Sequence, residues 1–183
     1  MQGNIRKYFE GEIALKDKDE LLFDLKLVDN LVGSVFGPIN LKFYLAGGSA
    51  CVLAGYIDRA TRDFDIVDTG YPSYLGKVFK LLEPYDLLTN YFAAIPKNYA
   101  KRAIKLEGFK NISVYIFSKE DIIASKIDRL SQKDIDDIKA IIGNIDKTLL
   151  NKCIEEAVEN IIYDDKKQRY LTNLNKFREM FDI

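Results

Sequence analysis

The chemistry open to this chain is limited first by a side chain that it lacks. None of the 183 residues is a histidine, which excludes Ser-His-Asp and Cys-His nucleophilic catalysis, histidine-ligated zinc and the usual general base near neutral pH. Any reaction must therefore use carboxylates, Lys, Arg, Tyr, Ser or backbone groups. Carboxylates without thiolate or imidazole partners favour a hard, oxygen-ligated ion such as Mg²⁺.

Two groups of residues could supply such chemistry, and the first is the turn Gly47-Gly48-Ser49 between two apolar runs. Glycines let the backbone turn sharply and approach a ligand closely. The free N–H groups and partial positive charge of a following helix N-terminus favour a phosphate. A turn of this composition is also common in α/β proteins, so alone it indicates little.

The second group is the acidic pair Asp63 and Asp65, which begins 14 residues after Ser49. Residues i and i+2 of a strand point to the same face, so the two carboxylates would converge on one point. They would repel each other until a divalent cation bridges them to a triphosphate. An Asp-x-Asp on an amphipathic strand is more often only a solvated face. The two groups together, in this order and spacing, are much more specific than either alone.

The elements that must position these residues follow from the spacing of apolar side chains. The segment 18–33 has an apolar stripe at helical spacing, 42–46 is a short strand that runs into the glycines, and 49–56 is apolar enough for a buried helix. Alternation at period two predicts a strand over 62–68. Further along we expect a helix over 74–82, strands over 91–95, 102–107 and 111–117, and helices over 122–130, 134–142, 148–162 and 165–181.

This order of elements predicts an α/β (α+β) fold, a mixed sheet with helices and a helical C-terminal cap. The apolar content of 48% and the charged content of 30% are those of an ordinary globular protein. The length fits a single domain over residues 1–183. Within it we expect a core over 40–142 and a C-terminal helical extension over 143–183.

Charge and cysteine content narrow the choice of partners and compartment. The net charge of −1 gives no general attraction to nucleic acid or to an anionic membrane, and it disfavours a long nucleic acid as partner. The N-terminus has no apolar signal-peptide core, and no apolar run approaches the roughly 20 residues of a membrane span. Cys51 and Cys153 lack a CxxC spacing, so we expect two reduced, buried thiols in a cytoplasmic protein.

A Gly-Gly-Ser turn before a helix, followed by an Asp-x-Asp strand, resembles the nucleotidyltransferase superfamily that includes DNA polymerase beta. Within it the chain is most similar to the AbiEii-like group of small bacterial proteins. RATRDFDIVD, residues 59–68, resembles the second motif of that group, in which a Thr and a basic residue precede Asp-x-Asp. Residues 117–142 resemble its later signature, in which an acidic residue opens a helix, a Lys follows on it, and an Asp-x-x-Asp pair opens the next helix. The resemblance covers about residues 40–142.

The resemblance implies a nucleotidyltransferase fold with a nucleotide-and-metal site around the first two groups of residues. Gly47, Gly48 and Ser49 would hold the phosphates of an NTP, while Asp63 and Asp65 would bind Mg²⁺ or Mn²⁺. An arginine next to the acidic pair, Arg62, could reach a phosphate, although a surface ion pair explains it equally well.

The later signature implies further roles. Lys126 would neutralise phosphate charge, and Asp134 with Asp137 would complete the motif. Each also has a structural explanation, because Lys126 could be a solvated residue beside an ion pair and acids in a first helical turn favour the helix dipole. Active members of the superfamily commonly place a third acid on a later strand, and the candidate here is Glu107, which could also be a surface charge. Otherwise Asp134 or Asp137 must serve, or the site binds nucleotide without turnover.

The function implied is that of a Mg²⁺-dependent nucleotidyltransferase that moves NMP from an NTP to an acceptor hydroxyl on a small molecule, a protein or an RNA end. The alternative is a catalytically silent module of the same fold that binds a protein, such as the partner in a toxin–antitoxin pair. A third interpretation is a plain α/β scaffold in which the motifs coincide by chance. That interpretation requires Ser49 to lie far from Asp63 and Asp65.

Overall fold

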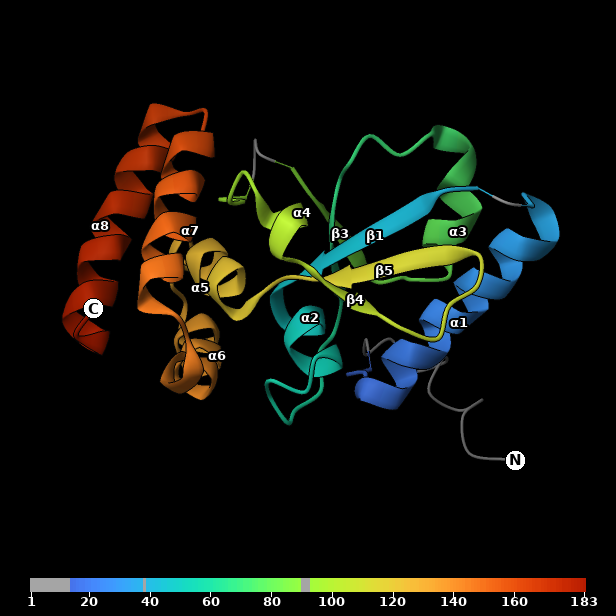
Figure 1. The fold of residues 1–183 in the computed structure, drawn as a ribbon, viewed down its shortest axis with the longest axis horizontal. Helices are drawn as coiled ribbons and strands as arrows, with labels where there is room; N and C mark the ends of the chain where they lie inside the picture. Colours follow the sequence, from blue (N-terminus) through green and yellow to red (C-terminus); the bar gives the residue numbers. More distant parts are fainter. Residues whose placement is uncertain (1–13, 38, 90–92) are drawn as a thin grey trace.

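The computed structural model describes residues 14–37, 39–89 and 93–183. Five strands form one mixed sheet with the order β3-β2-β1-β5-β4 (Figure 1). The strand bounds are Leu41–Ala46 (β1), Phe64–Val67 (β2), Tyr85–Leu88 (β3), Ile104–Leu106 (β4) and Ile112–Ile116 (β5). β1 is parallel to β5 and antiparallel to β2, β3 is parallel to β2, and β4 is antiparallel to β5. The predicted α/β class with a mixed sheet is confirmed.

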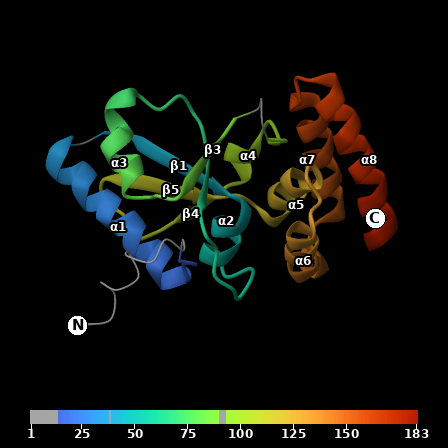
Figure 2. The ribbon, with the colours of Figure 1, turned by 180° about the vertical axis from the view of Figure 1, so that it is seen from behind.

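Helices lie around the sheet and beyond one of its ends. They are α1 (Lys18–Val35), α2 (Gly47–Leu53), α3 (Gly76–Lys80) with the short 3-10 turn η2 (Ser73–Leu75) before it, α4 (Tyr99–Arg102), α5 (Lys119–Ile127), α6 (Gln132–Ile141) with η3 (Ile142–Asn144) after it, α7 (Lys147–Asn160) and α8 (Asp164–Phe181). Figure 1 and the opposite view in Figure 2 both place α5 to α8 together at one end of the molecule and α1 with α3 toward the other.

The predicted elements between β2 and β5 are partly wrong. The strand expected over 91–95 is absent from residues 93–95, whereas residues 91 and 92 lie outside the described part of the chain. Ala94 and Ile95 are buried in the core as a loop, which explains their apolar character without a strand. The strand in this region is β3 instead, a four-residue strand at the sheet edge, too short to show a clear alternation. Arg102, expected to begin a strand, ends α4.

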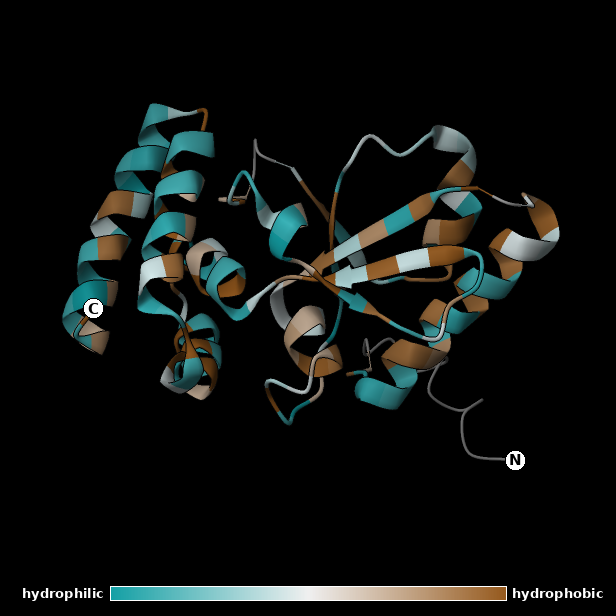
Figure 3. Cartoon of the chain, viewed as in Figure 1, coloured by the Kyte–Doolittle hydropathy of each residue, from teal (hydrophilic) through white to brown (hydrophobic). Residues whose placement is uncertain are grey.

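One face of the sheet packs against α1, α2 and α3 in a continuous hydrophobic core. Phe43 and Leu45 of β1 are completely buried, as are Leu25 and Val28 on the stripe predicted for the first helix. The ring of Phe79 in α3 meets that of Phe43 edge to face, with 5.8 Å between centroids. Figure 3 shows the apolar bands that alternate along β1 and β5, and mostly hydrophilic residues along α7 and α8. This core fixes the position of β1, and therefore of the glycine turn at its end.

The second face of the sheet carries the acidic residues. Ala46 pairs with Asp65 across β1 and β2, and Asp65 pairs with Asp86 across β2 and β3. Side chains of directly paired residues lie on the same face. Tyr44, two residues before Ala46, lies on this face too, and its ring meets that of Tyr99 in α4 at 5.2 Å. The second face is therefore partly covered by α4.

Ion pairs fasten α4 to the C-terminal helices. Nη2 of Arg102 lies 2.6 Å from Oδ1 of Asp121 in α5 and 2.8 Å from Oε2 of Glu156 in α7. Glu156 also accepts hydrogen bonds from the backbone and side-chain N–H groups of Asn98, at 3.0 and 2.9 Å. The hydrogen bonds from Arg102, followed by those from Asn98, lower the pKa of Glu156 to about 2. Glu156 is therefore ionised at neutral pH, and the cluster holds α4 in place over the sheet.

The two cysteines are buried and unpaired, as predicted. Burial raises the pKa of the Cys51 thiol to about 12, so the thiol is protonated and a poor nucleophile at neutral pH. Among the described residues, no helix combines the length and the apolar character that a bilayer crossing requires.

Candidate functional site

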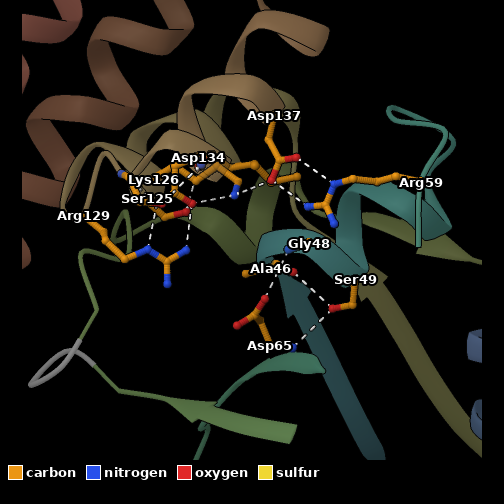
Figure 4. A network of polar contacts seen from close by, with 12 residues as sticks. Ala46, Gly48, Ser49, Arg59, Asp65, Ser125, Lys126, Arg129, Asp134 and Asp137 are labelled. Atoms are coloured by element: carbon orange, nitrogen blue, oxygen red, sulfur yellow. Dashed lines mark hydrogen bonds and ion pairs between the residues drawn. The ribbon is translucent and has the colours of Figure 1, made fainter. Parts of the chain in front are cut away.

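The Gly-Gly-Ser turn lies where β1 passes into α2, against the acidic strand (Figure 4). The N–H of Gly48 donates to Oδ2 of Asp65 at 3.2 Å, and the N–H of Asp65 donates to Oγ of Ser49 at 3.2 Å. Oγ of Ser49 in turn donates to the carbonyl oxygen of Ala46 at 3.3 Å. The two motifs are therefore in direct contact, and the interpretation as a plain scaffold with distant motifs does not hold.

Gly47 is the residue that permits this contact. Its φ of +55° lies in the left-handed region, where a side chain is strained. A Cβ added to Gly47 would also collide with the carboxylate of Asp65. A larger residue here would both strain the backbone and displace the carboxylate.

We expect Gly47→Ala to lower the free energy of unfolding by about 2–4 kcal/mol, since left-handed strain of about 1–2 kcal/mol adds to the collision. Urea denaturation measures this loss. Gly55→Ala is the matched control, because Gly55 follows the same helix with φ of +69° and its added Cβ would meet only Nζ of Lys18 at 3.8 Å. Equal losses in the two variants would contradict the collision with Asp65.

The acidic pair is a site of concentrated negative charge. Asp63 lies just before β2 and Asp65 within it. Burial, and after it the charge of Asp63, raises the pKa of Asp65 to about 6, against the opposing effects of the Gly48 N–H and of Lys126. Asp86 on β3 adds to the repulsion. A bound cation would relieve such a cluster of carboxylates.

Lys126 of α5 is buried between two aspartates at the start and middle of α6. Its Nζ lies 2.9 Å from Oδ1 of Asp134 and 2.8 Å from Oδ2 of Asp137. Burial works against all three charges, but the ion pairs outweigh it, so that the pKa of Lys126 is raised and the pKa values of Asp134 and Asp137 are lowered. The three side chains of the later signature therefore form one buried ionic cluster.

Two arginines extend this cluster toward the acidic pair. Arg59 donates to both carboxylate oxygens of Asp137, at 3.0 and 2.9 Å, and Arg129 donates to both oxygens of Asp134, at 2.7 and 2.8 Å. Hydrogen bonds to Asp134, and more distantly the charges of Asp65 and Asp63, raise the pKa of Arg129. Figure 4 shows the carboxylate of Asp65 and the guanidinium of Arg129 on the same side of this network.

Sequence reasoning missed Arg129 and Asp86. Arg129 lies one helical turn after Lys126, a spacing that could have placed both cations on one side. Its side chain is 72% exposed, so it can meet a ligand. Asp86 could not have been found without β3, because only the pairing of β2 with β3 brings it beside Asp65.

The remaining sequence candidates lie in different places. Nη2 of Arg62 lies 3.3 Å from Oδ2 of Asp63 in an exposed ion pair, so Arg62 is at the site. Glu107 follows β4, with its side chain 80% exposed and 3.8 Å from Nζ of Lys105. Three strand spacings separate β4 from β2, which amounts to about 14 Å. The structure does not bring Glu107 together with Asp63 and Asp65.

The donor set at the acidic pair fits a divalent metal that arrives with a nucleotide. Within the described residues, no three acidic or cysteine side chains gather closely enough to hold a metal ion by themselves. Mg²⁺ is commonly held by one or two carboxylates, with phosphate oxygens and waters completing its shell. Asp63 and Asp65 would supply the two carboxylates, and the charge of Asp63 is, after burial, the second cause of the raised pKa of Asp65.

Comparison with known families matches residues 24–182 to a family described as a nucleotidyltransferase of unknown function, DUF6036. The match includes the glycine turn, the acidic strand, the ionic cluster and the C-terminal helices. Neither the curated proteins nor the solved structures contain a match to the chain. The family match confirms the predicted relation to nucleotidyltransferases and does not test the narrower resemblance to the AbiEii-like group. The chain belongs to this DUF6036 family of nucleotidyltransferases.

Proposed function

We propose that the protein is a Mg²⁺- or Mn²⁺-dependent enzyme that transfers NMP from an NTP to the hydroxyl of an acceptor, with release of pyrophosphate. The observation that carries the proposal is the contact at 3.2 Å between the Gly48 N–H and the Asp65 carboxylate. This contact joins the glycine turn to the acidic strand, and the charges of Asp65 and Asp63 help to raise the pKa of the exposed Arg129. A triphosphate and a metal ion need these three kinds of group together.

Nucleotidyl transfer requires positioning and charge neutralisation more than covalent chemistry by the protein. Asp63 and Asp65 would hold the metal ion, which supplies charge neutralisation on the triphosphate when bound. The backbone at Gly48 and Ser49 would lie against the phosphates. Arg129 and Arg62, which are largely exposed, would orient the phosphates and stabilise the charge that develops on the leaving pyrophosphate.

We also propose that the protein is related to the AbiEii-like group. The supporting observation is that its two motif stretches meet, since Arg59 of the first pairs with Asp137 of the second. We take residues 40–142 as the catalytic core and 143–183 as a helical extension that holds α4 through Glu156. The two buried thiols fit a reducing compartment such as the cytoplasm.

A second candidate function is a catalytically silent module that binds a protein partner. The observation that favours it is the pairing inside the ionic cluster. Asp134 and Asp137, the two carboxylates next to Lys126, each already form an ion pair with an arginine. The later signature then stabilises the fold, and Arg129 is the cation of this cluster that is most exposed to a ligand.

Thermal unfolding of the wild type and of Asp63→Asn/Asp65→Asn, with each NTP and with or without Mg²⁺ or Mn²⁺, separates the two functions. Ligand at about 100 times its dissociation constant adds about 2.7 kcal/mol, a rise in melting temperature of roughly 5–10 °C for a chain of this size. Enzymatic function requires a metal-dependent rise in the wild type that the double variant lacks. No rise with any NTP and metal, from a folded protein, would favour the silent module.

The pH dependence of the ligand-induced rise in melting temperature checks that Asp65 binds the metal. Because its pKa is raised to about 6, the neutral carboxyl is favoured in the fold, and the unliganded protein loses stability as the pH rises from about 4 through 6. Metal binding has the opposite dependence, since it requires the ionised carboxylate. We expect affinity to fall about tenfold between pH 7.5 and pH 5 in the wild type. Asp136→Asn, an exposed change in α6, should behave as the wild type.

A further inference from the structure

A groove with a volume of about 420 Å³ opens beside the candidate site. Its lining residues come from β2 and the segment after it, the end of β3, α4 and the end of α7, and they include Val67, Thr89, Lys97, Tyr99 and Asn160. Val67 lies two residues after Asp65 on the same face of β2, about 7 Å along the strand. The groove therefore begins next to the acidic pair and runs away from it, beneath α4.

Within the part of the chain that the structure describes, one buried polar atom at the groove has no hydrogen-bond partner. Oγ1 of Thr89 is buried and accepts or donates no hydrogen bond within the described residues. Leaving such a hydroxyl unpaired has a cost in free energy, so it indicates a ligand or a water at this position. Asn160 lies at the same groove, with its Nδ2 fixed by donation to the carbonyl oxygen of Ile95 at 2.8 Å. Its amide oxygen is thereby oriented as a hydrogen-bond acceptor.

One aromatic ring, that of Tyr99, lines the groove, and other aromatic rings pack against it. Tyr99 lines it directly, and the ring of Tyr99 lies edge-on to Tyr44, which stacks on Tyr115 with 5.0 Å between centroids and an interplanar angle of 18°. All three tyrosines are only partly buried. Aromatic side chains of this kind stack with bases of any sequence.

The charges at the groove select an uncharged ligand. Lys97, which lines the groove, is paired with Glu159 at 3.1 Å, and Asp68 is a lining residue with negative charge. No surplus of positive charge is therefore available there for a phosphate. Two exposed cationic groups that could meet a phosphate, Arg129 and Arg62, lie instead beside the acidic pair.

We propose that this groove binds a nucleoside, with its base against Tyr99 and a hydrogen bond to Thr89 Oγ1. The proposal rests on the proposed function, whose triphosphate would lie at Asp63 and Asp65. The nucleoside has two possible sources with the same chemistry, the NTP itself or the terminal nucleoside of an RNA acceptor. The base lies beneath α4 in both cases, whereas the acidic, metal-binding side receives the triphosphate in the first case and the reacting hydroxyl of the RNA in the second.

Isothermal titration calorimetry of the full chain, with Mg²⁺ present throughout, tests this assignment. The probes are the four NTPs, inorganic tripolyphosphate and a mixed-sequence RNA hexanucleotide. The variants are Thr89→Val and Tyr99→Leu, with Thr172→Val in the exposed face of α8 as the matched control. Tyr99→Phe keeps the ring and should bind within about twofold of the wild type, so that the test stands if Tyr99→Leu fails to fold.

If the NTP is the source, the wild type binds one NTP at least about tenfold more tightly than tripolyphosphate. Thr89→Val then weakens NTP binding about three- to tenfold and Tyr99→Leu about tenfold or more, with tripolyphosphate binding unchanged. If the acceptor is the source, NTPs and tripolyphosphate bind alike and the same variants weaken only the RNA.

Two results would overturn the groove assignment. If both variants bind NTPs and RNA as the wild type does, while Asp63→Asn/Asp65→Asn loses tripolyphosphate, the nucleoside groove is wrong and the proposed function stands. If the wild type binds neither NTP nor tripolyphosphate with Mg²⁺, the proposed function fails and the groove assignment fails with it.

Discussion

Asp65→Asn should reduce nucleotidyl transfer on the order of a thousandfold while the fold stays intact. An asparagine has nearly the same shape, and its amide oxygen can still accept from the N–H of Gly48. The backbone N–H that donates to Ser49 Oγ is unaffected. The variant loses only a negative charge from the metal-binding pair, and metal catalysis contributes several kcal/mol of charge stabilisation.

The measurement is transfer of label from each NTP, labelled at the α-phosphate, to RNA, protein and small molecules of a cell extract. Asp136→Asn, which removes an acid outside the site, should transfer as the wild type does. The melting temperature of Asp65→Asn without metal should be unchanged or higher at pH 7.5, because a charge disfavoured by burial is gone. Equal labelling by Asp65→Asn and wild type would contradict the proposed function.

The acidic strand and the glycine turn could be predicted from the sequence because they are close in the chain. β1 and β2 are antiparallel neighbours joined through α2, so the pairing of Ala46 with Asp65 follows once both strands and the helix between them are recognised. The helices after β5 were also predictable. Ser118 and Ser131 accept hydrogen bonds from the N–H groups of Asp121 and Asp134, and such caps leave a recognisable local pattern.

The place of a strand within the sheet could not be predicted in the same way. The pairing of Lys105 with Tyr115 puts Lys105 on the second face, which carries Asp65, and Glu107 follows the strand with its carboxylate 3.8 Å from Nζ of Lys105. The distance to Asp65 depends instead on strand order and register, which are set by pairing between segments far apart in the chain. Asp86 could not be predicted as a neighbour of Asp65 either. It lies on β3, whose four residues show too little alternation to be recognised as a strand.

Lys126→Met should lower the free energy of unfolding by about 3 kcal/mol at pH 7. Removing one partner from a buried ion pair typically costs about 3–5 kcal/mol, since the remaining charge is left uncompensated. The low end of this range applies here because Asp134 keeps its ion pair with Arg129 and Asp137 keeps its ion pair with Arg59. The aspartate pKa values are lowered in the fold, so their contribution is present above the unfolded pKa near 4 and is lost as the pH falls below it. The deficit measured by urea denaturation should therefore shrink toward pH 3.

Lys133→Met, an exposed change in α6, is the matched control and should alter stability by less than about 0.5 kcal/mol. A Lys126→Met variant as stable as this control would contradict the buried cluster. The double variant Lys126→Met/Asp137→Asn then separates structure from function, because it removes a carboxylate that has lost one of its two cationic partners and should recover part of the stability. If metal-dependent NTP binding recovers with it, Lys126 only supports the fold. If binding stays weak in the restabilised protein, the charge of Lys126 acts on the triphosphate, as the later signature implies.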